Sequence, residues 1–282
     1  MITLAKNPFY SKNRIMEKEI NIKSALEYYL LAGVDETVGD RPFELGSETV
    51  KASPAPVVLP RPAPAQTTAP ARQATTELAQ ATATACKNAH EICSQAKTLE
   101  ELRQAVENFE GCALKLTAAH TVFGDGNPQA KIVLIGEAPG ADEDRIGIPF
   151  VGRSGKLLDK MLAAIGLDRS DYYITNILPW RPPGNRTPTG GEIAVCLPFL
   201  KRQLEIINPD YILLLGGSSA NALFDNQEPI SRLRGRWLEY PKGNGSSAQA
   251  LATFHPAYLL RNTGQKAKAW TDLLKLYKEA VG

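Results

Sequence analysis

The amino-acid sequence predicts a three-layer α/β/α sandwich with a central, mainly parallel sheet of four strands. In residues 131–254, short apolar runs that end at Gly, Asn or Pro alternate with segments of helical periodicity. Strands that alternate strictly with helices form parallel sheets that helices cover on both faces. Because the composition changes sharply upstream, we expect this domain to occupy residues 86–282.

Two segments are expected before the domain. Residues 52–85 consist mostly of Ala, Pro, Thr and Gln, with six prolines from Pro54 to Pro70, and this composition predicts a disordered linker that buries no core. Within residues 1–51, apolar residues recur at near-helical spacing and predict one amphipathic helix over Glu17–Leu31. This helix is either a solvated or self-docking element or the binding site of a protein partner, and the sequence leaves both open.

Within the domain, a helix is expected first. Thr98 and Glu101 have the spacing of a capping box, and the helix that they open carries the apolar stripe Leu99, Leu102, Val106 and Phe109. Four apolar runs then predict buried strands at Lys131–Ile135, Tyr172–Leu178, Tyr211–Leu215 and Ala250–Phe254. Helices are predicted between and after the strands, at Ser154–Ile165, Gly191–Ile207, Ser218–Phe224 and Lys266–Ala280.

Composition excludes several classes of protein. No apolar run approaches the ~20 residues that span a bilayer, so we expect a soluble protein without a membrane partner. Four cysteines in 282 residues argue against a disulfide-stapled secreted protein and favour the reducing cytoplasm. With 32 Lys plus Arg against 30 Asp plus Glu, the net charge is +2, so overall charge alone indicates no nucleic-acid partner.

The ends of the predicted strands carry most of the motifs. Ligands of open α/β sheets bind in the crevice beyond the carboxyl ends of the strands, so these residues form the expected site. The segments that follow the four strands are Gly136–Gly140, Asn176 with Trp180–Arg186, Gly216–Ser218 and His255–Ala257. Three of the four are rich in polar groups and stiffened by Pro or Gly, which favours a rigid binding site.

Four blocks at these positions carry a family resemblance. They are, in chain order, GEAPGADEDRIGIPFVGRSGKLL, ITNILPWRPPGNRTP, LRGRW and HPAYLLRN. Over about Leu102–Tyr277 the sequence resembles the type-4 branch of the uracil-DNA glycosylase superfamily, in which the same blocks occur in this order. The resemblance implies an enzyme that hydrolyses the N-glycosidic bond of deoxyuridine in DNA and so starts base excision repair. Its partner would be uracil-containing DNA, and we expect a monomer that needs no cofactor for the chemistry.

The resemblance and the chemistry of the residues together predict a uracil pocket. Phe150, in a loop held by Pro and Gly, would stack on the extruded base, and a core position under the loop is the competing interpretation. Asn176 offers an amide donor and an acceptor that match O4 and N3–H of uracil, and its alternative is to cap the following turn. Glu137 would hold the loop after the first strand, and the backbone of Ala138 would contact the base.

His255 is the predicted catalytic residue. As uracil leaves, negative charge develops on its O2 atom, and a histidine that donates a hydrogen bond there would stabilise the transition state by about 3 to 4 kcal/mol. Water must then attack C1′ of the sugar. The best-known branch of the superfamily uses an Asp for this step where the present sequence has Ala138, so the task falls to Glu143 or Asn185, and the sequence does not decide between them.

The DNA-binding surface is predicted from basic residues near the motifs. Residues 152–155, at the start of a helix, form a natural phosphate site. Tyr258 and Leu259 would be inserted into the minor groove to fill the gap that the extruded base leaves. The side chains expected to contact DNA are Arg153, Ser154, Arg186, Arg234, Tyr258, Leu259 and Arg261.

The cysteines depart from the family pattern. Type-4 enzymes usually hold a [4Fe-4S] cluster with four cysteines, and the four ligand positions are occupied here by Phe109, Cys112, Trp180 and Cys196. We therefore expect the cluster to be absent, with the two aromatic residues filling its space and the two cysteines as its remnant. A cluster that uses Cys86 and Cys93 is the alternative, although their spacing has no match in the pattern.

A second class of function is open at this point. A protein that keeps the fold but has lost turnover would be a DNA-binding or repair accessory module, recruited through its N-terminal helix. The missing cluster ligands and the long linker favour this alternative, and the intact strand-end residues oppose it.

Overall fold

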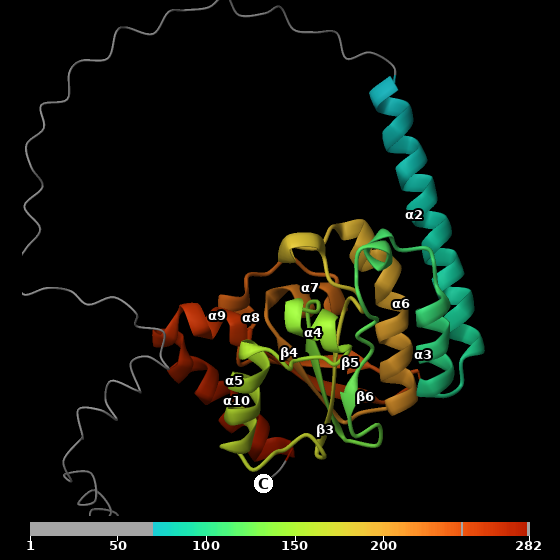
Figure 1. Ribbon diagram of the computed structural model, residues 1–282. Helices are drawn as coiled ribbons and strands as arrows, with labels where there is room; N and C mark the ends of the chain where they lie inside the picture. The colour runs from blue at the N-terminus through green and yellow to red at the C-terminus, as the bar shows by residue number, and fades with distance from the viewer. Residues whose placement is uncertain (1–69, 244, 281–282) are drawn as a thin grey trace, which may run out of the picture. The chain divides into compact units, whose positions relative to one another are not determined.

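The computed structural model describes residues 70–243 and 245–280 (Figure 1). The predicted helix Glu17–Leu31 and residues 52–69 of the predicted linker lie outside the described residues. Within this part of the chain, six strands form a sheet in the order β1-β3-β2-β4-β6-β5. The strands are β1 (Asp125–Gly126), β2 (Ile132–Gly136), β3 (Tyr172–Asn176), β4 (Tyr211–Leu215), β5 (Trp237–Pro241) and β6 (Ser247–Thr253).

The centre of the sheet is parallel, as the sequence predicts. β2 pairs with β3 on one side and with β4 on the other, and β4 pairs with β6, all in parallel. The predicted total of four strands is wrong, because β1 and β5 pair antiparallel with β3 and β6 at the two edges. β1 has two residues, and β5 carries only half-buried and exposed residues. Neither strand is a buried apolar run, so the hydrophobic pattern does not predict them.

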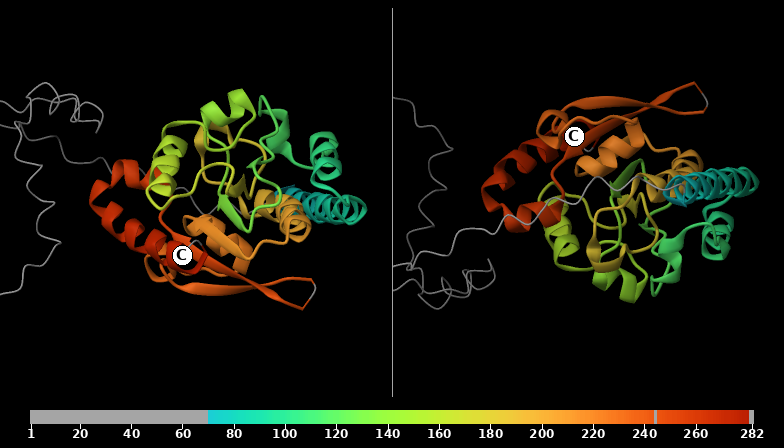
Figure 2. Two further views of the ribbon diagram at one scale, coloured as in Figure 1. Left: turned by 90° about the horizontal axis from the view of Figure 1, so that it is seen from below. Right: turned by 90° about the horizontal axis from the view of Figure 1, so that it is seen from above.

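Helices cover both faces of the sheet and confirm the three-layer sandwich (Figure 2). Val133 and Ile135 of β2 point into one core, whereas Ile132 and Leu134 point into the other, which is the period of two that a strand imposes. The first core is closed by α2 (Pro70–Gln95), α3 (Leu99–Asn108), α6 (Gly190–Ile207) and α7 (Gly217–Phe224). The second is closed by α5 (Arg153–Ala163) and α10 (Lys266–Ala280).

α2 begins inside the expected linker. Pro70 is its first residue, so the prediction of disorder is wrong for residues 70–85. Proline is well tolerated in the first turn of a helix, and the sequence that follows consists largely of strong helix formers such as Ala, Gln and Glu. Ala85, Ala89 and Cys93 are buried in the same core as α6, a tertiary contact that composition alone does not reveal.

Three further α-helices of the described residues are short. They are α4 (Ala141–Ile146), α8 (Ile230–Leu233) and α9 (Pro256–Arg261).

The predicted capping box at the start of α3 is confirmed. The Thr98 hydroxyl accepts a hydrogen bond from the N–H of Glu101 at 3.1 Å, and the Glu101 carboxylate accepts one from the N–H of Thr98 at 3.3 Å.

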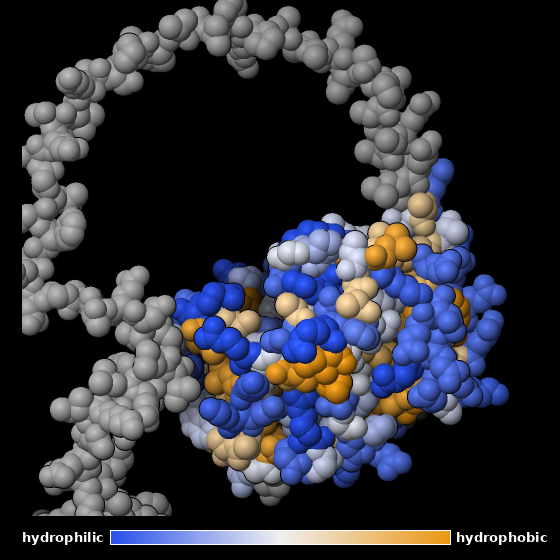
Figure 3. Space-filling view, in the orientation of Figure 1, coloured by the Kyte–Doolittle hydropathy of each residue, from blue (hydrophilic) through white to orange (hydrophobic). Residues whose placement is uncertain are grey.

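The surface is polar over most of the face seen in Figure 3, and its apolar residues form separate areas. Most large apolar side chains of the described residues are buried in the cores on the two faces of the sheet. Among the described helices, none has the length and apolar character needed to cross a membrane.

Candidate active site

A pocket of about 450 Å³ opens at the carboxyl ends of the parallel strands. Most of the predicted site residues line it, namely Glu137, Ala138, Glu143, Phe150, Ser154, Asn176, Asn185, Arg186, His255, Tyr258 and Arg261. Pro182 and Ala257 also line the pocket, and sequence reasoning assigns them no role because short apolar side chains carry no chemical signal. Three strand ends, those of β2, β3 and β6, therefore meet at one site as expected for an open α/β sheet.

His255 stands at the N-terminus of α9 with a defined tautomer. Its Nδ1 accepts a hydrogen bond from the backbone N–H of Ala257 at 3.1 Å. Because Nδ1 acts as an acceptor, the neutral ring carries its proton on Nε2, which can donate to a ligand. Burial, and to a smaller extent the charge of Arg261, lower the pKa of His255 from 6.5 to about 4. The ring is therefore neutral at pH 7 and still a hydrogen-bond donor.

Asn176 is buried at the last position of β3, directly opposite Gly136 of β2. Within the described part of the chain its Oδ1 is buried and accepts no hydrogen bond. A Cβ atom on Gly136 would overlap both this Oδ1 and the ring of Phe150, so glycine makes room for the two side chains. An acceptor buried without a partner costs free energy until a ligand supplies a donor.

Phe150 belongs to the core and to the pocket wall at once. Its side chain is 5% exposed, and the centroid of its ring lies 5.8 Å from that of His255. The backbone of Phe150 has φ = 55°, in the left-handed region that costs a residue with a Cβ about 1 to 2 kcal/mol. Such a conformation persists only where the surroundings hold it, and it commonly occurs at functional sites.

Glu143 links two loops of the pocket through its carboxylate. Oε2 accepts a hydrogen bond from the N–H of Gly140 at 3.1 Å, and Oε1 accepts one from the N–H of Gly152 at 2.8 Å. The first glycine follows β2, and the second follows Phe150 in the chain. Both carboxylate oxygens are thus engaged by backbone donors, an arrangement that suits a residue that holds the pocket in shape.

Two further polar residues at the pocket are held by neighbours. The Nε of Arg181 donates to the Oδ1 of Asn185 at 2.7 Å, which leaves the NH₂ of the Asn185 amide available to a ligand or water. Arg186 donates to both oxygens of Glu192, at 2.6 and 2.9 Å, and this pairing lowers the pKa of Glu192 to about 2. Arg186 therefore lines the pocket with its charge already compensated.

Three of the predicted DNA contacts do not line the pocket. Arg234 forms an ion pair with the buried Asp272, with N and O atoms 2.6 Å apart, and a buried carboxylate needs this counterion, so the contact of Arg234 with DNA stays a prediction. Leu259 is fully buried in a cluster with Phe254, so the predicted wedge is instead a core residue on the buried side of α9. Arg153 is exposed at the first residue of α5 and stays a predicted contact.

The residues at the predicted cluster positions do not fit an iron–sulfur cluster. The rings of Phe109 and Trp180 are stacked with centroids 6.5 Å apart, and Phe199 packs against Phe109 at 5.1 Å. The Sγ atoms of Cys112 and Cys196 lie 3.9 Å apart. The Cys196 thiol donates a hydrogen bond to the Cys112 sulfur, and this bond raises the pKa of Cys196 and lowers the pKa of Cys112. In residues 70–243 and 245–280, no group of three His, Cys, Asp or Glu side chains is arranged to hold a metal ion.

The chain is similar to known DNA repair enzymes over the region that contains the sheet and the pocket. Residues 123–274 match the family model of the Uracil DNA glycosylase superfamily. The type-4 uracil-DNA glycosylase of Thermotoga maritima is 41% identical over 171 residues, which are 60% of this chain and 87% of that protein. The type-4 uracil-DNA glycosylase of Archaeoglobus fulgidus is 41% identical over 184 residues, or 64% and 92%. A type-5 uracil-DNA glycosylase of Pyrobaculum aerophilum is 28% identical over 158 residues, or 50% and 67%.

Proposed function

The chain belongs to the uracil-DNA glycosylase superfamily, and we propose that it removes uracil from DNA by hydrolysing the N-glycosidic bond, as a monofunctional repair enzyme. The observation that carries this proposal is a pocket that joins an aromatic ring, a neutral histidine and an amide oxygen that has no hydrogen-bond partner among the described residues. Excision of a base requires a stacking surface, a partner for the edge of the base and a donor for the leaving anion.

The direct test is the release of free uracil from single-stranded and U:G oligonucleotides by the wild-type protein. We expect uracil and an abasic site as products. A folded protein that binds these oligonucleotides and releases no uracil would instead be the non-catalytic DNA-binding module, an alternative that the complete pocket does not favour.

In the proposed reaction the uracil is bound before it is cut. Phe150 stacks on the extruded base, and the Asn176 amide accepts a hydrogen bond from N3–H and donates one to O4. Cytosine has an acceptor at N3 and a donor at the exocyclic position. Its N3 would face the Oδ1 acceptor of Asn176, and its exocyclic NH₂ would face the NH₂ donor of the same amide. The Oδ1 of Asn176 supports this role, because N3–H of uracil supplies the donor that it lacks in the described part of the chain.

Bond cleavage leaves a negative charge on uracil and a positive charge on the sugar. The Nε2–H of His255 donates to O2 of the departing uracil and so stabilises its charge. An oxocarbenium-like sugar needs only a weak nucleophile, so the water has to be oriented rather than strongly activated. We assign that task to Asn185, which lines the pocket, and assign Glu143 to holding the loops. As the water oxygen bonds to C1′, the water loses a proton, which passes to the departing uracil anion or to solvent.

The pH dependence of kcat follows from the lowered pKa of His255. The neutral ring accepts at Nδ1 and donates at Nε2, and protonation of Nδ1 would place its N–H against the N–H of Ala257. We therefore expect kcat to stay constant between about pH 5 and 8 and to fall only toward the pKa of about 4. Replacing Arg261 by Gln removes a charge that lowers this pKa, so the acid limb should move to higher pH. An inflection near the ordinary value of 6.5 in the wild-type profile would contradict this assignment.

The same pKa makes folding stability depend on pH. The pKa of His255 is about 4 in the folded protein and near the ordinary 6.5 in the unfolded chain, so the unfolded chain binds more protons between these values. The contribution of His255 to the free energy of unfolding is therefore complete above pH 6.5 and decreases as the pH falls toward 4.

We further propose that the protein holds no [4Fe-4S] cluster. The stacked Phe109 and Trp180 and the contact between Cys112 and Cys196 support this proposal, since aromatic rings occupy two of the four ligand positions and fill the region with apolar packing. We expect the purified protein to lack the absorbance shoulder near ~400 nm and to contain less than one iron atom per chain. Replacing Cys112 by Ala should leave uracil release unchanged. About four irons per chain, lost in this variant, would contradict the proposal.

The remaining proposals concern surroundings and partners. DNA would contact the pocket through Arg153, Ser154, Arg186, Tyr258 and Arg261. We propose a monomer that acts in the cytoplasm, where thiols stay reduced, in line with four free cysteines among the described residues. The segment that contains Glu17–Leu31 would then bind a protein partner.

A further inference from the structure

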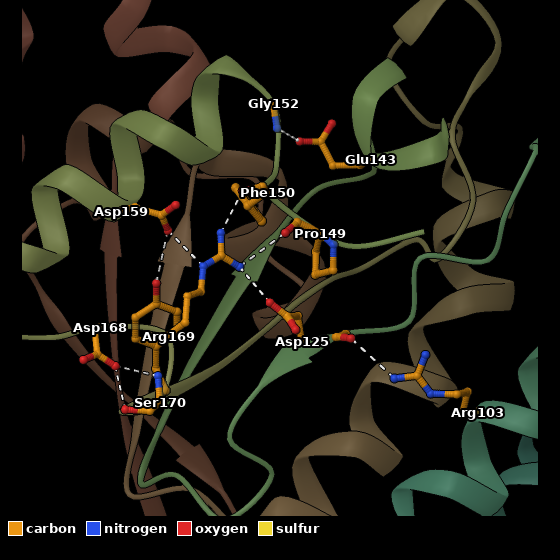
Figure 4. A network of polar contacts seen from close by, with 12 residues as sticks. Arg103, Asp125, Glu143, Pro149, Phe150, Gly152, Asp159, Asp168, Arg169 and Ser170 are labelled. Atoms are coloured by element: carbon orange, nitrogen blue, oxygen red, sulfur yellow. Dashed lines mark hydrogen bonds and ion pairs between the residues drawn. The ribbon is translucent and has the colours of Figure 1, made fainter. Parts of the chain in front are cut away.

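Arg169 binds the backbone of the segment that carries the pocket ring. It lies in the loop between α5 and β3, and sequence reasoning assigns it no role. Its Nη2 donates to the carbonyl of Phe150 at 2.7 Å, and its Nη1 donates to the carbonyl of Pro149 at 3.3 Å (Figure 4). One guanidinium therefore holds two successive carbonyl groups, although Arg169 itself does not line the pocket.

The guanidinium of Arg169 is held in place by residues from three elements. Its Nε is 2.9 Å from a carboxylate oxygen of Asp159 on α5, and its Nη1 is 3.3 Å from one of Asp125 on β1. The hydroxyl of Tyr172, at the start of β3, donates to the same oxygen of Asp159, and the guanidinium lies 6.0 Å from its ring centroid. Two carboxylates compensate the charge while the planar group keeps donors for the two carbonyls.

The Phe150 backbone needs such a restraint. Its positive φ is disfavoured for a residue with a side chain, so a loop that is free to relax would leave this conformation. Gly155 leaves space for the same carbonyl, because a Cβ atom on it would overlap the Phe150 oxygen. Beyond the ring, Glu143 accepts a hydrogen bond from Gly152 at 2.8 Å. The segment is thus held by Arg169 at the carbonyls of residues 149 and 150 and by Glu143 at the N–H of Gly152, as Figure 4 shows.

We propose that Arg169 is a positioning residue for uracil excision, which keeps the Phe150 ring beside His255 by binding the carbonyls of residues 149 and 150. This inference depends on the proposed function, since it assigns the stacking of the base to Phe150. Arg169 acts through the loop and does not contact the base. Lysine replaces it poorly, because a single ammonium group cannot present the planar set of donors that spans two carbonyls and two carboxylates.

The test compares Arg169→Gln with a matched arginine elsewhere. Arg202 also donates twice to a backbone carbonyl, that of Ala96, and pairs with a carboxylate, that of Glu205. The side chains of Arg169 and Arg202 are 28% and 26% exposed, so Arg202→Gln removes similar contacts on α6, at a residue that does not line the pocket. We expect Arg169→Gln to lower kcat/KM for uracil release by about 10- to 100-fold, and Arg202→Gln to change it by less than about twofold. Arg169→Lys should fall between wild type and Arg169→Gln.

A double-mutant cycle separates positioning from general destabilisation. In a Phe150→Ala background, where no ring is left to position, Arg169→Gln should cause little further loss of activity. Inhibition of the enzyme by free uracil should weaken in Arg169→Gln and stay unchanged in Arg202→Gln, with thermal unfolding recorded for every variant. If Arg169→Gln does not fold, the same cycle is run with Arg169→Lys.

The outcomes are distinct. Equal losses from Arg169→Gln in the wild-type and Phe150→Ala backgrounds, or unchanged inhibition by uracil, would overturn the positioning role while the enzyme remains an active glycosylase. A wild-type protein that releases no uracil would instead refute the proposed function, and with it the premise of this inference.

Discussion

Replacing His255 by Ala should lower kcat for uracil release by about 10² to 10³-fold, because the transition state loses the donor to O2 of the leaving uracil. KM should change little, since the hydrogen bond gains strength only as charge develops on the base. Single-turnover release of uracil from a U:G oligonucleotide measures the effect on the chemical step. A variant that keeps wild-type kcat would remove His255 from the mechanism.

The His255 substitution needs a control for stability, because Nδ1 also caps α9 through the N–H of Ala257. Loss of a helix cap typically costs about 0.5 to 2 kcal/mol. Serine is a good N-cap residue, so His255→Ser should recover most of this stability and none of the activity. If the serine variant recovered activity along with stability, the loss in His255→Ala would reflect an unfolded helix rather than a missing donor.

Replacing Asn176 by Asp should lower kcat/KM for uracil by at least about 10³-fold, because a carboxylate has no donor for O4 of uracil. The substitution preserves the shape of the side chain, and it leaves Gly136 and the ring of Phe150 in the same packing. Competition between uracil- and cytosine-containing oligonucleotides measures how far the preference for uracil declines. Unchanged discrimination would mean that other groups select the base.

Asn221 offers a matched control for Asn176. It lies on α7, does not line the pocket, and its Oδ1 is also buried without a hydrogen bond in the described residues. Asn221→Asp places the same new charge at a buried oxygen of a half-buried residue, so it should cost stability without the loss of discrimination. A comparable loss of kcat/KM in Asn221→Asp would assign the effect of Asn176→Asp to a general disturbance of the fold.

The elements that local patterns determine were predictable from the sequence. Runs such as Tyr211–Leu215 are buried on both faces and bounded by turn residues, so they indicate parallel strands wherever they pack. The site followed from the same strands, because their carboxyl ends meet at one edge of the sheet. The edge strands β1 and β5 were missed because their pairing, rather than an apolar pattern, makes them strands.

Features that depend on long-range contacts could not be predicted. The sequence does not show that Asp272 is buried and takes Arg234 as its counterion, or that Leu259 of α9 packs against Phe254 and Ala269. Arg169 gave no signal either, since its contacts with Phe150 and Asp125 join positions 19 and 44 residues away. Local residue types reveal which groups can do chemistry, whereas the groups that hold them in place are determined by tertiary packing.

Glu192 and a DNA phosphate would compete for the same guanidinium, that of Arg186. A DNA phosphate that binds Arg186 meets a guanidinium that already donates two hydrogen bonds to Glu192, so it uses the remaining N–H groups of a charge that is already compensated. Because Glu192 already compensates the charge of Arg186, binding a phosphate to it yields less free energy than binding one to a free arginine. Binding should also release fewer counterions from the DNA than the number of arginines at the pocket suggests. Arg186 would therefore add little to the non-specific affinity for DNA. Its larger contribution would be to favour a DNA strand that is correctly positioned in the pocket.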